Sequence, residues 1–345
     1  MNSPRLSPLL ALAAIVLVLP RLLFDSADFA LLSLAVVYAI VGLSLNVLIG
    51  YAGTISLGHQ AFVGVGAFTS AYMVTVQGQS FWVGVFVAAA VGGAQALVLG
   101  GVSLRIRGLY FALVTLSYGL VAEQNIFQIE ELTGGGAGQP APKPDWFDTE
   151  WRYYYLCLAF LAVVLYLDWR MIRSKAGRSL LALRENPRVA ATFGINVRMA
   201  ALFAFVLSGV FAGVAGALIA HNDTFVSPDV WNFRLALVFV IMTVVGGLRS
   251  RAGLVIGGAF FALLPHLIEQ IPGVDTALAA IPGPYDLTPE IAPLVIGPLL
   301  LLLTLTMFPG GIGQQIRPVV RWLGGRRFDP HDRGLKEVQI TDVRA

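Results

Sequence analysis

The side chains that most often bind metals or attack substrates are few and scattered in this sequence. Cys157 is the only cysteine, so the sequence predicts neither a thiolate metal site nor an intrachain disulfide. None of the three lysines follows a glycine, as the phosphate-binding loop of nucleotide-binding proteins requires, and no Gly-x-Ser-x-Gly nucleophile motif occurs. The histidines stand far apart, at His59, His221, His266 and His331. We therefore expect no catalytic residue, no metal and no cofactor.

Polar residues gather instead in a glycine-rich stretch, "NVLIGYAGTISLGHQAFVGVGAF", at residues 46–68. Irregular backbone at membrane depth is tolerated only inside protein or along a wet cavity, and polar side chains there are costly when they face lipid. The stretch either lines a translocation path or supplies hydrogen bonds between helices, and both interpretations stay open. For His59 alone, a structural hydrogen bond is the favoured interpretation. The candidate path residues in this stretch are Asn46, Gly50, Gly53, Ser56, Gly58, His59 and Gln60.

Two further features interrupt the apolar sequence. Glu123, in "LSYGLVAEQNIF", stands late in its apolar run. It is the eighth candidate for the path, although a carboxylate at such a place can also reach interfacial water. A second glycine-rich stretch, "VVGGLRSRAGLVIGGAF", carries Gly253 and Gly257 at a four-residue spacing. Close packing of helices is the favoured interpretation, and a place on the translocation path is the alternative.

The elements that must position these residues are apolar runs of roughly membrane-spanning length. Hydrophobic residues make up 57% of the chain and charged residues 12%, about half the usual charged fraction of soluble proteins. The sequence thus predicts an all-α polytopic membrane protein with about ten spans. Nucleic-acid binding is not expected, because basic residues in such chains mainly mark cytoplasmic loops. The runs are residues 9–23, 29–49, 55–76, 81–104, 109–127, 153–167, 199–220, 235–248, 254–268 and 291–308.

Loop charges orient the predicted spans. Residues 169–198 hold seven basic residues and one acid, whereas residues 129–152 hold five acids and two basic residues. The basic loop should face the cytoplasm. Both termini then fall in the cytoplasm, with an uncleaved first span, a membrane domain at residues 1–313 and a polar tail at 314–345. If residues 50–76 re-entered rather than spanned, the charges would fit less well, so we prefer spanning.

The basic loop has helix signals of its own. Ser174 can cap a helix through "GRSLLALREN", and Asn186 can cap a second one with Pro187 at its first position and Gly194 as its stop. Two short surface helices are predicted. They could rest on anionic lipid or dock a partner protein, and the residues alone do not decide between these.

Several motifs in order resemble those of LivM-type permeases, the membrane subunits of ATP-binding-cassette importers for branched-chain amino acids. They are "LNVLIGYAGTISLGHQAF", "IRGLYFALVTLSYG", "LTGGGAG", "GRSLLALRENPRVAATFGINV", "VVGGLRSRAGLVIGGAF" and "FPGGIGQ". The resemblance covers residues 35–313. It implies that the basic loop, as a pair of coupling helices, docks an ATPase subunit, through residues Arg184, Glu185, Asn186, Pro187, Ala190, Ala191 and Gly194.

The same resemblance implies a multi-pass protein of the bacterial cytoplasmic (inner) membrane that works with three partners. The three kinds of partner are a pair of cytoplasmic ATPases, a homologous second permease and an external substrate-binding protein. Thr54 and Gln60 depart from the residues usual in the family, and the outer loop lacks an acid directly after its glycines. Urea or short amides therefore stay open as substrates. A secondary transporter driven by an ion gradient is the alternative from another class.

Overall fold

The computed structural model describes residues 20–21, 26–103, 108–270, 292–307 and 310–323. The predicted first span lies outside the described residues apart from residues 20–21, and so does the chain beyond residue 323.

Each of the other nine predicted runs contains a helix among the described residues, as the apolar sequence and the near absence of interior proline and charge favour. The long helices are α2 (Ser26–Leu45), α3 (His59–Thr75), α4 (Phe81–Ser103), α5 (Leu109–Gln124), α7 (Glu150–Arg173), α10 (Val197–Asp223), α11 (Phe233–Gly246), α12 (Arg251–Glu269) and α14 (Ala292–Met307). Five helical stretches are long and apolar enough to cross a membrane, and one of them continues from α2 to Ala52. The all-α membrane architecture is confirmed, and the count of ten spans stays a prediction.

Short elements connect these helices. They are the π-helix η1 (Asn46–Ala52), η2 (Ile126–Gln128), α6 (Glu130–Thr133), η3 (Gly135–Ala137), η4 (Asp145–Phe147), α8 (Lys175–Glu185), α9 (Pro187–Thr192) and η5 (Pro228–Val230). Strands β1 (Gln139–Pro140) and β2 (Phe225–Val226) pair antiparallel, with Gln139 opposite Val226. Helix α15 (Gly311–Leu323) runs through residue 314, where the polar tail was predicted to begin, and the boundary of the tail stays a prediction.

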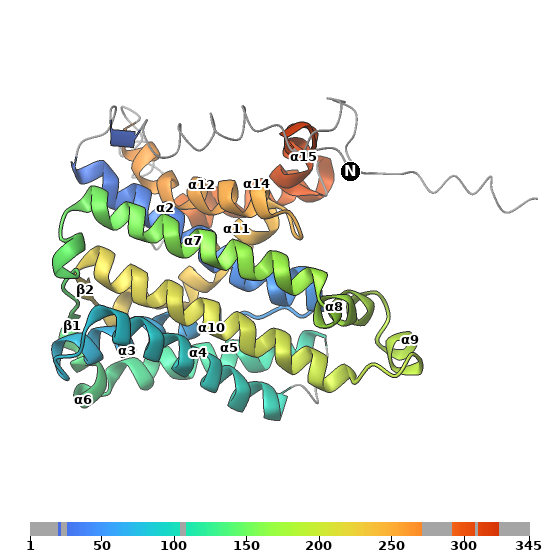
Figure 1. Ribbon diagram of the computed structural model, residues 1–345, viewed down its shortest axis with the longest axis horizontal. Helices are drawn as coiled ribbons and strands as arrows, with labels where there is room; N and C mark the ends of the chain where they lie inside the picture. Colours follow the sequence, from blue (N-terminus) through green and yellow to red (C-terminus); the bar gives the residue numbers. More distant parts are fainter. Residues whose placement is uncertain (1–19, 22–25, 104–107, 271–291, 308–309, 324–345) are drawn as a thin grey trace, which may run out of the picture.

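The long helices lie side by side, and α10 runs through the middle of the bundle (Figure 1). Its small residues permit very close contact with its neighbours. A Cβ atom added to Gly216 would lie 2.8 Å from Ala67 N of α3 and closer still to the Val63 carbonyl oxygen. The same holds where α11 meets α12, because a Cβ on Gly257 would lie 2.7 Å from Gly246 Cα. The packing interpretation of the second glycine-rich stretch is confirmed.

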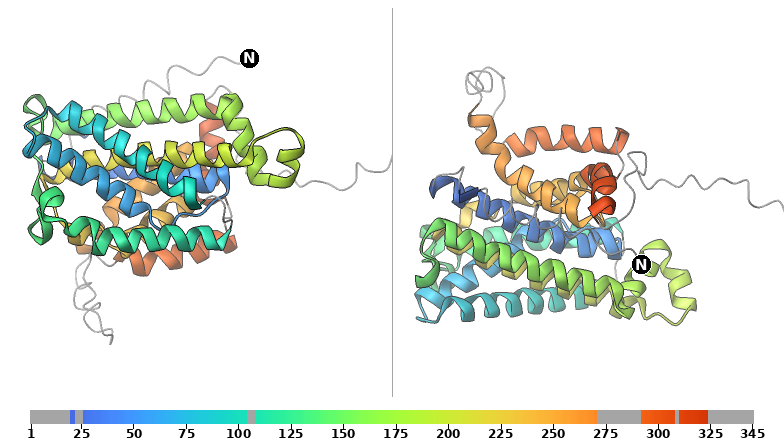
Figure 2. Two further views of the ribbon diagram at one scale, coloured as in Figure 1. Left: turned by 90° about the horizontal axis from the view of Figure 1, so that it is seen from below. Right: turned by 45° about the horizontal axis from the view of Figure 1, so that its top comes forward.

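Two ends of the bundle can be distinguished by their loops (Figure 2). One end carries the acid-rich loop 129–152, and we call it the acidic end. There Thr75 Oγ1 donates to Pro140 O at 2.6 Å and Asn222 Nδ2 donates to Ala30 O at 3.3 Å. At the other, the basic end, Arg198 donates to Gly101 O at 3.1 Å, and helices α8 and α9 project from the bundle.

Helix α3 therefore runs from the basic half of the bundle to the acidic end, antiparallel to α2. It begins at the depth of Ser44, because His59 Nε2 lies 2.9 Å from Ser44 Oγ, and it ends at Thr75. This course favours spanning over re-entry for residues 50–76. Which end faces the cytoplasm stays a prediction from the loop charges.

Candidate functional site

The first glycine-rich stretch begins as a widened continuation of α2. Residues 46–52 form η1, Gly53 turns the chain with a φ of 71°, and the backbone is not helical again until His59. Asn46 explains part of this geometry, since its Oδ1 accepts a hydrogen bond from Arg249 N at 2.8 Å. A Cβ on Gly50 would overlap that same oxygen. Asn46 thus ties the first glycine-rich stretch to the second, and Gly50 leaves the space for it.

The two short helices of the basic loop form as predicted. Ser174 Oγ accepts from Gly177 N at 3.3 Å, which caps α8. Asn186 Oδ1 accepts from Arg188 N at 3.0 Å and from Val189 N at 3.3 Å, which caps α9, and Pro187 occupies its first position. Gly194 has a φ of 76° and its N–H donates to Ala191 O, while Ile195 N donates to Ala190 O. These two bonds are the pattern of a Schellman C-cap.

The α8–α9 pair presents a mixed surface. Glu185, Asn186, Ala191 and Gly194 are exposed, Arg184 and Pro187 are half-buried, and Ala190 is buried against the bundle. Phe193, next to Gly194, is 81% exposed. It was not among the predicted docking residues.

Arg184 brings the two predicted sets of residues together. Its Nη1 donates to the Gly50 carbonyl oxygen, across 134 positions of sequence, and its Cγ lies 3.1 Å from the place where Gly53 would carry a Cβ. Partial burial, and then the charge of Arg249, lower the pKa of Arg184. A displacement of α8 would thus act directly on η1.

A buried ion pair beside this contact was missed by the sequence analysis. Asp168, near the end of α7, is fully buried, and its Oδ2 accepts from Arg251 Nε at the start of α12. Tyr51 OH of η1 donates to the same oxygen at 3.2 Å. The available signal was an acid standing one residue beyond the apolar run 153–167 in an otherwise basic region.

The remaining path candidates do not form one cluster. His59 faces Ser44, whereas Gln60 is fully buried beside Gly119 of α5, and neither of its amide atoms has a partner among the described residues. Ser56 is also buried, and Gly58 lies against the Thr115 carbonyl of α5. Glu123 lies apart, at the acidic end, where its Oε2 accepts from Phe233 N at 3.1 Å and caps α11. Their role in a path stays a prediction.

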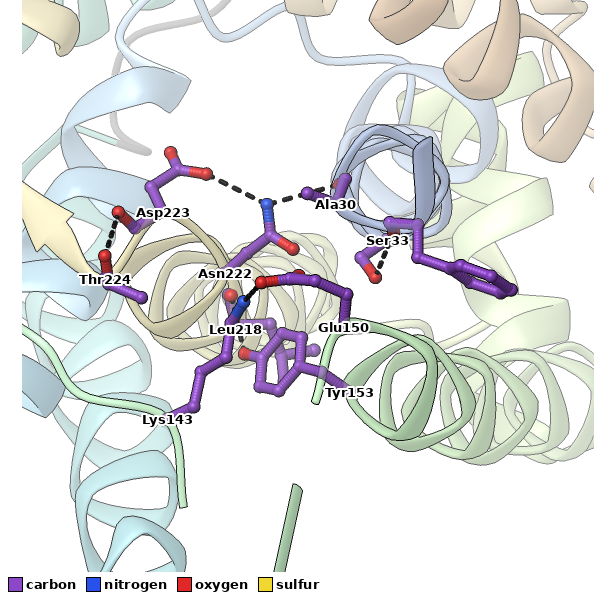
Figure 3. A network of polar contacts seen from close by, with 10 residues as sticks. Ala30, Ser33, Lys143, Glu150, Tyr153, Leu218, Asn222, Asp223 and Thr224 are labelled. Carbon is purple, nitrogen blue, oxygen red and sulfur yellow. Dashed lines mark hydrogen bonds and ion pairs between the residues drawn. The ribbon is translucent and has the colours of Figure 1, made fainter. Parts of the chain in front are cut away.

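The acidic end holds a second polar network (Figure 3). Lys143 pairs with Glu150, Tyr153 OH donates to Leu218 O at 2.7 Å, and Asn222 Nδ2 donates to Asp223 Oδ1 at 2.9 Å. Next to it is an open hollow of about 690 Å³ that Lys143 and Glu150 help to line. These contacts fix the loop that carries β1 to the ends of α7 and α10.

Comparison with known proteins places these features in a wider group. A family model described as "Branched-chain amino acid transport system / permease component" matches residues 29–304. The permease protein LivM of the high-affinity branched-chain amino acid transport system of Escherichia coli (strain K12) is 30% identical over 266 residues, which are 69% of this chain and 63% of that protein. The match therefore spans less than two thirds of that relative.

Two further relatives match smaller parts of the chain. The probable branched-chain amino acid transport permease protein LivH of Methanocaldococcus jannaschii is 38% identical over 31% of this chain and 33% of its own length. The autoinducer 2 import system permease protein LsrC of Enterobacter sp. (strain 638) is 30% identical over 53% of this chain and 50% of its own. No solved structure matches the chain.

Proposed function

Because the chain belongs to the family of branched-chain amino acid transport system permease components, we propose that it is the membrane-spanning subunit of an ATP-binding-cassette importer. In this proposal it moves branched-chain or related amino acids that an external binding protein delivers. A homologous second permease completes the path, and separate cytoplasmic subunits hydrolyse ATP. The chain itself is a transport subunit and not an enzyme.

The observation that carries this proposal is the contact between Arg184 and Gly50. The α8–α9 pair projects from the basic end, and its exposed residues include Glu185 and Gly194 of the predicted docking set (Figure 1). Behind that surface, Arg184 holds the carbonyl of Gly50 in the irregular part of the bundle. A partner bound to α8–α9 would therefore act, through Arg184, on the backbone of η1.

The substrate is inferred from relatives with different cargoes. Two of them are called branched-chain amino acid permeases and one an autoinducer 2 import permease. A urea or short-amide permease, which the departures from the family at Thr54 and Gln60 leave open, is the alternative within the class. The secondary transporter finds less support, because it would need a carboxylate to bind the coupling ion. Glu123 caps a helix and Asp168 is paired with Arg251, so both carboxylates already have partners.

Co-purification tests the docking surface. With candidate ATPase subunits co-expressed, we expect Glu185→Ala combined with Gly194→Ala to lower the recovered ATPase by at least tenfold, since the first removes an exposed charge and the second strains the C-cap of α9. Gly78→Ala is the matched control for the second change, because Gly78 also has a positive φ and nothing within 4 Å of its added Cβ. Uptake by the chain alone in vesicles without ATP would overturn the proposal.

A substitution of Arg184 tests whether the contact with Gly50 transmits movement of the docked ATPase to the bundle. Arg184 belongs to the predicted docking set, but its side chain is half-buried and donates to the Gly50 carbonyl instead of pointing to an exposed surface. We therefore expect Arg184→Met to leave the ATPase bound and to lower ATP-driven uptake in proteoliposomes by about tenfold or more, because a hydrogen bond from a charged donor contributes roughly 1.5–3 kcal/mol. Arg188→Met, a change of the same type at an exposed position of α9, should leave uptake near its original rate. Equal uptake by the two variants would show that the Gly50 contact transmits nothing.

A further inference from the structure

A groove runs along the surface where the end of α7 meets the beginning of α10. It has a volume of about 580 Å³. The two helices lie next to each other at this point, close to α8 (Figure 1). The residues that line it are Leu167, Trp169, Arg170, Met171, Arg173, Ser174, Phe203 and Leu207.

The rim of the groove is positively charged. Arg170 and Arg173 are both exposed, and no acidic residue lines the groove. The Arg170 side chain has no hydrogen-bond or ion-pair partner among the described residues, and the Arg173 guanidinium lies 4.0 Å from the ring centroid of Trp169. The nearby carboxylate of Asp168 is buried and already paired with Arg251. Two cationic groups at one rim are therefore available to an anion.

The floor of the groove is apolar and lies deeper in the bundle. Leu167 stands six residues before the end of α7, and Leu207 stands ten residues after the start of α10. At 1.5 Å per residue they lie about 9 and 15 Å from those helix ends. Leu167 and Phe203 are 44% and 42% exposed, and the charged lining residues, Arg170 and Arg173, stand nearer the end of α7. In a membrane that the bundle spans, residues this far from the helix ends lie at the level of the hydrocarbon core.

Polarity along the groove thus changes in the order in which it changes along a phospholipid. The arginines are placed for the phosphate, Trp169 and its stacked neighbour Tyr166 for the interface, and the apolar floor for an acyl chain. Basic pockets between transmembrane helices at the cytoplasmic side suit anionic headgroups. We propose that this groove is a binding site for one anionic phospholipid, held by Arg170 and Arg173.

Native mass spectrometry of the full chain tests the site. Protein reconstituted with phosphatidylglycerol or with phosphatidylcholine would be released from detergent and the retained lipid counted. We expect preferential retention of phosphatidylglycerol, and an apparent affinity about tenfold weaker in Arg170→Gln combined with Arg173→Gln. The matched control is Lys175→Gln combined with Arg188→Gln, which removes two exposed cations of the same surface outside the groove and should retain the lipid.

Two further experiments test whether the ligand is a lipid with acyl chains and not a free anion. Leu207→Trp fills the floor without changing the charge, and we expect it to displace the lipid as well. Glycerol phosphate, which carries the anion without acyl chains, should not compete. The proposal is overturned by equal retention of the two lipids, by loss of lipid in the control, by competition from glycerol phosphate, or by an ATPase subunit that cross-links to residues 170 and 173 and expels the lipid. Gel filtration of each variant confirms that it is folded.

Discussion

Arg251→Met is expected to destabilise the protein by roughly 3 kcal/mol or more, because it leaves the carboxylate of Asp168 buried without its counter-charge. Asp168 is fully buried, and one of its oxygens has no partner among the described residues even with the pair intact. Arg251 also stands at the first residue of α12, where the helix dipole disfavours a cation. The ion pair therefore explains why an arginine is tolerated at that position.

The reverse change should cost less. Asp168→Asn keeps an oxygen for Tyr51 and Arg251, and the Arg251 side chain is 32% exposed and can reach water. Thermal unfolding in detergent, followed by size-exclusion chromatography, would compare the two variants with Arg188→Met as a control. If Asp168→Asn lowers the Tm as much as Arg251→Met, the loss of stability in Arg251→Met is not caused by an unpaired buried carboxylate.

The second large effect is expected at the centre of the bundle. Gly216→Ala places a methyl group against the backbone of α3, 2.8 Å from Ala67 N and in overlap with Val63 O. Backbone cannot move aside as a side chain can, so α3 and α10 must separate. We expect a cost of about 2–3 kcal/mol, the upper part of the range for overpacked cores.

Gly101→Ala is the matched control, since Gly101 also lies in a long helix but has nothing within 4 Å of its added Cβ. That variant should be unchanged or slightly more stable, because alanine favours the helix. Both would be measured by Tm under the same conditions. An equal fall in both would mean that glycine matters for the flexibility of the helices and not for their contact.

Much of the fold could be predicted from local sequence. The apolar runs fixed the places of the long helices, because burial of apolar surface in lipid depends on composition over about 20 residues. The caps of α8 and α9 followed from Ser174, Asn186, Pro187 and Gly194, because capping bonds join residues at most five positions apart. The continuation of α2 as a π-helix was not predicted, and its first residue, Asn46, is bonded to the amide of Arg249, which is distant in sequence.

The candidate site could be predicted only as separate parts. The docking residues and the path residues were recognised independently, but nothing in a single sequence indicates that Arg184 reaches Gly50. The ion pair of Asp168 was not predicted, because its partners, Tyr51 and Arg251, are distant in sequence. For Glu123 an intramembrane role and an interfacial one were both open, and the bond to Phe233 N provides a third, a helix cap.

The hydrogen bonds of His59 decide whether this side chain could conduct protons for transport driven by a proton gradient. Ser44 donates its hydroxyl proton to Ser208 O at 2.7 Å, and Ser208 donates its own to Ser44 O at 2.9 Å. Each hydroxyl has one proton, so His59 Nε2 must be the donor to Ser44 Oγ. A proton can hop along such a chain only if every acceptor can release one in turn, and a peptide carbonyl cannot. The chain that starts at His59 therefore ends at two carbonyls, and it offers no route by which a proton gradient could be discharged through the bundle.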